Sequence, residues 1–102
     1  MKYLLIIPPE VEESIAHFHP LLKRKVRYAL QEIQEDPLLG KPLKGPLEGL
    51  RSYRVTRYRI VYRVVRRKVL VEVIDIGPRE MIYERILQIL RLRPFLYNRN
   101  FL

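Results

Sequence analysis

A basic segment with alternating residue types lies at residues 51–68. It reads RSYRVTRYRIVYRVVRRK and contains eight arginines or lysines and no carboxylate. On a period of two, Arg59 and Arg63 fall on one side of an extended chain, while Ile60 and Tyr62 fall on the other. This pattern predicts a β-strand that buries one face and presents guanidinium groups on the other. Guanidinium groups held on a rigid sheet suit bidentate recognition of phosphate oxygens.

A second candidate for chemistry is the segment IGPREMIYE at residues 76–84, in which Arg79 lies four residues before Tyr83. The arginine could add another phosphate ligand. Tyr83 also has a structural explanation, because tyrosine is commonly half buried with its hydroxyl in water. The two segments together indicate a site for an anionic ligand.

The composition describes one small basic domain. With 102 residues the chain can build one modest core but not two, and its net charge of +9 attracts nucleic acid or anionic lipid. The chain has no cysteine, which excludes disulfides, thiol catalysis and cysteine-built zinc sites and favours a reducing cytoplasm. His17 and His19 are two residues apart and do not share a helical face, so we predict no metal and no other cofactor.

The opening segment MKYLLIIPPE does not predict export or membrane insertion. Its apolar run of five residues, followed by prolines and acids, is too short for a signal peptide or a membrane span. We therefore expect a soluble cytoplasmic protein with no membrane partner.

The N-terminal part of the chain predicts a strand and a helical hairpin. Residues 2–7 form an apolar run that ends at Pro8–Pro9, which predicts a short buried strand. A helix then begins at the second proline, and His19–Pro20 separates it from a second amphipathic helix that ends near Asp36–Pro37.

The C-terminal part predicts a β-meander and a final helix. Residues 37–49 hold three prolines and three glycines and therefore predict a connecting loop. Three strands joined by tight turns follow at residues 50–56, 58–65 and 69–76, and a helix runs from Gly77–Pro78 to about Leu92, before Pro94.

The expected fold class is therefore α+β, with the order β-α-α-β-β-β-α. We expect a small, antiparallel-rich, four-stranded sheet with a helical hairpin and a C-terminal helix. Residues 1–94 are expected to form the domain and residues 95–102 a C-terminal tail.

Several segments, in this order, resemble the RelE/ParE superfamily of toxins from toxin–antitoxin pairs. The segments are LKGPLEGLRSYRV, YRIVYRV, VLVEVIDIG and GPREMIYE. The resemblance implies a small sheet flanked by helices and a toxin that a cognate antitoxin neutralises. Active members of the superfamily cleave messenger RNA in the ribosomal A site, and other members poison DNA gyrase.

The resemblance also implies the catalytic residues. Its nuclease members use basic residues on the second strand, an arginine in the YRxxY strand, an arginine after the last strand and a tyrosine near the start of the final helix. Some of these nucleases have a second basic residue where this chain has Ser52. Relatives that use a glutamate or histidine as general base have it where this chain has Lys41. The matching catalytic positions are Arg54, Arg59, Arg79 and Tyr83.

These residue types suit RNA cleavage without a metal ion. Attack of a ribose 2′-hydroxyl on the adjacent phosphate builds negative charge on the nonbridging oxygens, which fixed guanidinium groups stabilise. Tyr83 could act as the base if arginines lower its pKa, or it could stack on an unpaired base. The remaining basic residues of the strands and the loop are expected to attract RNA or the ribosome, or else to form a solvated face. They are Lys41, Lys44, Arg51, Arg63, Arg66, Arg67 and Lys68.

Three functions stay open at this point. The first is a ribosome-dependent endoribonuclease, whose partners are messenger RNA, the ribosome and an antitoxin. The second is an inhibitor of DNA gyrase that cuts no phosphoester bond. The third is an inactive relative kept as an interaction module, for which Ser52 is the best support.

Overall fold

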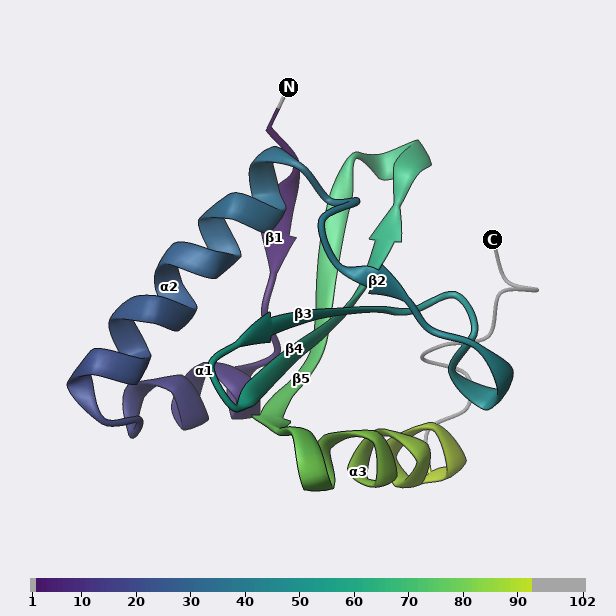
Figure 1. Ribbon diagram of the computed structural model, residues 1–102. Helices are drawn as coiled ribbons and strands as arrows, with labels where there is room; N and C mark the ends of the chain where they lie inside the picture. Colours follow the sequence, from purple (N-terminus) through teal and green to yellow (C-terminus); the bar gives the residue numbers. More distant parts are fainter. Residues whose placement is uncertain (1, 93–102) are drawn as a thin grey trace.

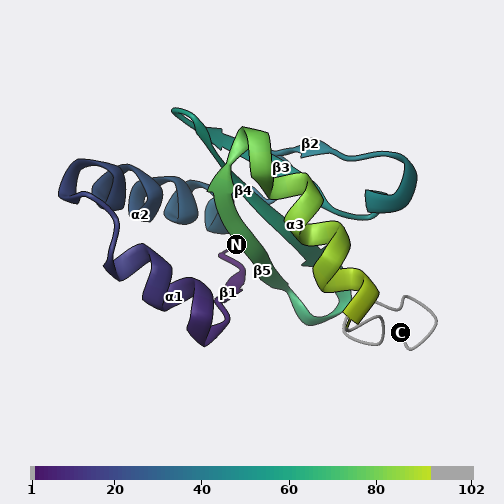
Figure 2. The same cartoon turned by 90° about the horizontal axis from the view of Figure 1, so that it is seen from below.

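A computed structural model describes residues 2–92, which form a five-stranded sheet with helices on both faces (Figure 1). The elements in chain order are β1 (Leu4–Ile6), α1 (Pro9–Ala16), α2 (Pro20–Glu35), β2 (Lys41–Pro42), β3 (Arg51–Val55), β4 (Tyr58–Val65), β5 (Leu70–Pro78) and α3 (Arg79–Leu92). The strand order is β1-β5-β4-β3-β2, with β1 parallel to β5 and the other neighbours antiparallel. Helices α1 and α2 pack on one face and α3 on the other (Figure 2).

The helical hairpin forms where prolines and caps predict it. Pro9 occupies the first turn of α1, where no backbone donor is needed, and Glu10 and Glu12 lie near the positive end of the helix dipole. The Nδ1 atom of His19 accepts a hydrogen bond from the Leu21 amide at 3.2 Å and so caps α2.

Strand β4 is buried on both faces, because a helical layer covers each side of it. Ile60 and Tyr62 lie in the larger core against α1 and α2. Val61 points the other way, into a smaller core that contains Leu50 and Ile86 of α3. The predicted alternation is therefore correct, but α3 covers the middle of the face that was expected to be basic.

Two details of the predicted sheet were wrong. The loop at residues 37–49 supplies a fifth strand, β2, which pairs with β3 and which its proline and glycine content concealed. Strand β1 is an edge strand and is not buried, since Leu4 and Ile6 are 60% and 41% exposed. The α+β class and the predicted helices are confirmed, whereas the predicted stop at Pro94 and the tail lie outside the described residues. Within residues 2–92, no helix has both the length and the apolar character needed to cross a bilayer.

A buried tyrosine ties the connecting loop to the sheet. The Tyr62 hydroxyl donates to the Pro37 carbonyl oxygen at 2.7 Å and accepts from the Gly40 amide at 2.9 Å. A Cβ atom at Gly40 would lie 2.7 Å from this hydroxyl oxygen, so only glycine fits beside it. Burial raises the pKa of Tyr62, and the Gly40 amide and Arg51 partly oppose the rise.

Candidate active site

Two arginines face each other across the β3–β4 hairpin. Arg54 and Arg59 are directly opposite in the antiparallel register, so both side chains leave the same face of the sheet. Their Cβ atoms are therefore about 5 Å apart, a position in which like charges destabilise a sheet. Arg54 Nε donates to the Thr56 carbonyl oxygen at 3.2 Å, and Arg59 donates to that of Tyr58 at 3.4 Å. Both guanidinium groups keep further donors for an anionic ligand.

The hairpin turn and the start of α3 add two more arginines. Thr56 and Arg57 form the two-residue turn between β3 and β4, and Thr56 has φ +55°, which is uncommon for a β-branched residue. The Arg79 amide donates to the Arg57 carbonyl oxygen at 2.9 Å. This bond places the first turn of α3 beside the hairpin turn.

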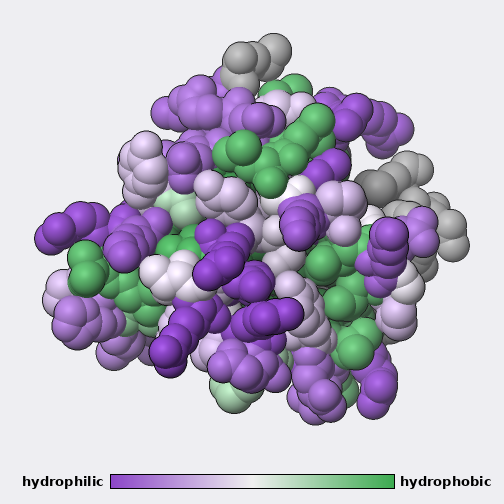
Figure 3. All heavy atoms as spheres, viewed as in Figure 1, coloured by the Kyte–Doolittle hydropathy of each residue, from purple (hydrophilic) through white to green (hydrophobic). Residues whose placement is uncertain are grey.

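The four arginines Arg54, Arg57, Arg59 and Arg79 line one pocket of about 430 Å³, together with Thr56 and Glu80. Among residues 2–92, none of the four forms an ion pair with a carboxylate. Hydrophilic side chains gather over the hairpin on this side of the molecule (Figure 3). We call this region the arginine pocket, and its net positive charge suits a phosphodiester.

Tyr83 lies on α3 one turn after Arg79, and its hydroxyl is already hydrogen-bonded. The Tyr83 and Ser52 hydroxyl oxygens are 3.0 Å apart, and the tyrosine ring packs against the smaller core. Ser52 is 8% exposed and lies two residues before Arg54 on the same face of β3. Ser52 therefore lies beneath α3, and its hydroxyl is hydrogen-bonded to that helix.

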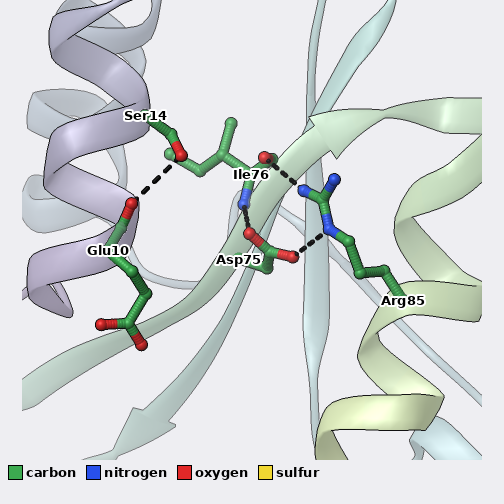
Figure 4. A network of polar contacts seen from close by, with 5 residues as sticks. All are labelled: Glu10, Ser14, Asp75, Ile76 and Arg85. Atoms are coloured by element: carbon green, nitrogen blue, oxygen red, sulfur yellow. Dashed lines mark hydrogen bonds and ion pairs between the residues drawn. The ribbon is translucent and has the colours of Figure 1, made fainter.

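An ion pair holds α3 against β5 (Figure 4). Arg85 Nε donates to Asp75 Oδ2 at 2.7 Å, and Arg85 Nη2 donates to the Ile76 carbonyl oxygen at 3.0 Å. A Cβ atom at Gly77 would lie 2.6 Å from Arg85 Nη2, so glycine leaves room for the guanidinium group. The contact fixes α3 on the sheet and with it the position of Arg79.

Comparison with known proteins decides the family. The profile of the ParE-like toxin of type II bacterial toxin–antitoxin systems matches residues 5–87. The chain belongs to this family. The predicted membership of the RelE/ParE superfamily is therefore confirmed. A comparison with curated protein sequences finds no match to this chain.

The toxin also resembles solved structures of RelE and YoeB toxins. It is 25% identical to a chain of the toxin–antitoxin complex RelBE2 from Mycobacterium tuberculosis, covering 78% of this chain and 100% of that chain with a TM-score of 0.69. A mutant of the Escherichia coli toxin RelE in the free state is 24% identical, with 86% and 97% covered and a TM-score of 0.70. The YoeB/ParE toxin from Agrobacterium tumefaciens is 23% identical, with 74% and 98% covered and a TM-score of 0.65.

Two of the predicted RNA-binding arginines of the toxin are engaged within the fold. Arg51 lies on the face opposite the arginine pocket and donates to the Gly40 carbonyl oxygen at 2.7 Å. Arg63 donates to Glu72 Oε1 from Nε at 3.0 Å and from Nη2 at 2.5 Å. Both side chains stabilise the fold of the toxin, which leaves fewer donors for RNA.

The remaining predicted contacts lie at different distances from the arginine pocket. Residues 66–68 are exposed at the far end of β4, about 23 Å along the strand from Arg59. Lys41 is exposed and lies opposite Ser52, so its side chain leaves the same face as the pocket. Lys44 is exposed in the loop that follows β2.

Sequence reasoning assigned no function to Arg57 and Glu80, which also line the pocket. The predicted strands at residues 50–56 and 58–65 leave Arg57 in the turn between them. The two-residue length of that turn is a usable signal, because it keeps a turn side chain beside the ends of both strands. Glu80 lies within the recognised segment GPREMIYE, but its place at the pocket depends on how α3 packs against the hairpin.

Proposed function

We propose that this toxin is an endoribonuclease that cleaves messenger RNA on the ribosome without a metal ion. The observation that carries the proposal is the arginine pocket, in which four guanidinium groups surround one space without forming carboxylate ion pairs among residues 2–92. Negative charge grows on the phosphate when a 2′-hydroxyl attacks it, and donors fixed in advance stabilise that charge. Arg54, Arg59 and Arg79 are the proposed catalytic residues for this role.

The ribosome would supply the messenger RNA strand and help to orient it. The net charge of +9 favours this association, and the exposed basic turn at residues 66–68 lies far enough from the pocket to contact ribosomal RNA at the same time. Such a function places the toxin in the cytoplasm.

Primer extension on messenger RNA from a translating ribosome reaction tests this proposal. We expect new 5′ ends within the coding sequence when both toxin and ribosomes are present, and loss of amino acid incorporation in cells before DNA synthesis falls. Intact messenger RNA together with early arrest of DNA synthesis would contradict the proposal.

The ParE-like family match favours inhibition of DNA gyrase as a second candidate. Under this alternative the arginine pocket binds an acidic surface or DNA, and no phosphoester bond is cut. A gyrase supercoiling assay run beside the ribosome assay separates the two functions. A ribonuclease should cut messenger RNA and leave supercoiling unchanged, whereas a gyrase inhibitor should block supercoiling and leave messenger RNA intact.

We further propose that an antitoxin neutralises the toxin by adding a strand at β1. Relatives of known structure were solved as complexes, including RelBE2 from Mycobacterium tuberculosis and RelE–RelB from Pyrococcus horikoshii. Strand β1 is an edge with exposed Leu4 and Ile6, and an exposed edge accepts an extended segment. Ile6 lies opposite Glu72, which also lines a largely apolar groove of about 470 Å³ between α1 and α3.

An acidic, partly disordered antitoxin could cover the arginine pocket with another segment.

Replacing Leu4 with aspartate should weaken neutralisation by the product of the adjacent small gene. Its side chain is 60% exposed on the edge strand, so we expect at least roughly a tenfold rise in the Kd, or about 1.4 kcal/mol, with little loss of stability. Isothermal titration of the purified pair measures this effect. Leu21→Asp is the matched control, because Leu21 is 51% exposed in the first turn of α2, whereas α2 contacts the start of β1 at its other end, where the Tyr3 amide donates to the Gln34 carbonyl oxygen. Equal affinities for both variants would rule out docking at β1.

Two single substitutions define the role of the Tyr83 hydroxyl. Tyr83→Phe and Ser52→Ala each remove the same 3.0 Å hydrogen bond, so both should lower the free energy of unfolding by about 1 kcal/mol. We expect both variants to cleave at nearly the parent rate in single-turnover assays, because this bond turns the hydroxyl toward β3. A slower Tyr83→Phe beside an unimpaired Ser52→Ala would instead assign the hydroxyl to the reaction.

A further inference from the structure

Cleavage through the 2′-hydroxyl needs an acceptor for the hydroxyl proton, and the four arginines cannot supply it. A guanidinium group stays protonated in proteins and has no acceptor atom. The Tyr83 hydroxyl is bonded to Ser52, and Tyr83 does not line the arginine pocket. The acceptor must therefore be sought among the other groups that surround the pocket.

Glu80 is the carboxylate that lines the arginine pocket. It lies in the first turn of α3, directly after Arg79, and its side chain is exposed. Among residues 2–92, neither an ion pair nor a hydrogen bond engages this carboxylate. The Arg85–Asp75 contact anchors the same helix on β5 (Figure 4). The hydrogen bond from the Arg79 amide to the Arg57 carbonyl oxygen holds the first turn of the helix, which contains Glu80, beside the hairpin turn.

We propose that Glu80 is the general base of the reaction, an inference that rests on the proposed ribonuclease function. The Glu80 carboxylate takes the proton of the 2′-hydroxyl, and the 2′ oxygen forms a bond to phosphorus. The bond between phosphorus and the 5′ oxygen breaks, and the departing oxygen takes a proton from water. The hydroxide left behind takes the proton from Glu80, which restores the carboxylate. The products are a 2′,3′-cyclic phosphate and a 5′-hydroxyl end, and no oxidant or other reactant is required.

The charges around Glu80 make this assignment testable, because a general base and a carboxylate without a role in the reaction predict different effects of removing Glu80 on RNA binding and on the cleavage rate. Arg54 of β3, Arg57 of the turn, Arg59 of β4 and Arg79 of α3 all face the same pocket as Glu80. The arginines attract the phosphodiester, whereas the carboxylate repels it. A carboxylate with no part in proton transfer would therefore hinder the reaction slightly, and its removal would strengthen RNA binding without slowing cleavage.

The experiment measures Glu80→Gln in single-turnover cleavage of messenger RNA on purified ribosomes, using the full chain. We expect the rate constant at saturation to fall roughly 100-fold or more, while the half-saturating toxin concentration stays the same or decreases. Glu80→Asp keeps the carboxylate and should recover part of the rate. Glu84→Gln is the matched control, because Glu84 is exposed one turn later on the same helix and does not line the pocket.

The pH dependence provides a readout that a structural role would not change. The parent rate should fall in acid as its base becomes protonated, and Glu80→Gln should lose this limb of the profile. Thermal unfolding confirms that each variant is folded. Cleavage by Glu80→Gln at the parent rate with the same pH profile would overturn the assignment of Glu80 and leave the ribonuclease function standing. A parent protein that does not cut messenger RNA would instead overturn the proposed function and this inference with it.

Discussion

Arg59→Ala and Arg79→Ala are each expected to slow the cleavage step roughly 100-fold or more while leaving ribosome binding nearly intact. This factor corresponds to losing about 3 kcal/mol of transition-state stabilisation, the usual cost of removing one fixed donor to a developing oxyanion. Arg59 lies opposite Arg54 in the sheet, and Arg79 is held to the hairpin turn by its backbone amide. Neither guanidinium group has a carboxylate ion pair among residues 2–92, so its loss should change stability little. Single-turnover cleavage at saturating toxin measures the effect.

Arg66→Ala and Arg67→Ala are the matched controls for charge alone. Each removes one positive charge from an exposed turn about 23 Å along β4 from Arg59. They should weaken binding modestly and in a salt-dependent way, with an unchanged rate at saturation. If the pocket variants and the control variants all cleave at the parent rate when saturated, the arginine pocket is only a docking surface.

The sequence predicted most of the fold because its signals are local. Each of these elements has its own hydrophobic periodicity and its own terminating residues. They are the helical hairpin, the strands β4 and β5 on either side of residues 66–68, and the final helix after Gly77–Pro78. Strand β2 could not be predicted in this way, because it has only two residues, one of them a proline, and so shows no hydrophobic periodicity. It forms by pairing with β3, a contact that no local signal in the loop reveals. The exposure of Leu4 depends on the place of β1 at the edge of the sheet, which its apolar composition does not reveal.

The grouping of residues at the candidate site could be predicted from the sequence only for those that lie on one strand or on a pair of strands joined by a short turn. The strand register places Arg54 beside Arg59, and the short turn brings Arg57 to the same end of the hairpin. The ion pair of Arg63 with Glu72 is also a matter of register, because these residues lie opposite each other on β4 and β5. A basic strand face read from sequence alone therefore overstates the number of arginines available to a ligand.

Tyr62→Phe should cost the toxin several kilocalories per mole of stability although it removes a single oxygen atom. The Tyr62 hydroxyl satisfies the Pro37 carbonyl and the Gly40 amide, and all three residues are buried. Phenylalanine would leave a donor and an acceptor unpaired, at about 1–3 kcal/mol each, so we expect a loss of roughly 2–6 kcal/mol. Urea unfolding measures it. Tyr28→Phe is the matched control, because Tyr28 is 63% exposed on α2 and should change stability by less than about 0.5 kcal/mol.

The same hydroxyl should make the toxin sensitive to alkaline solution. Burial raises the pKa of Tyr62, so the folded protein keeps the phenolic proton at pH values where the unfolded chain loses it. This contribution is complete below the unfolded pKa of about 10 and is lost as the pH rises through the higher pKa of the folded state. The urea midpoint of the parent should therefore decline above about pH 10 more steeply than that of Tyr62→Phe. Parallel declines for the two proteins would contradict this assignment. Because Tyr62 lies on the face of β4 opposite the arginine pocket, Tyr62→Phe should still cleave at the parent rate under conditions in which it is folded.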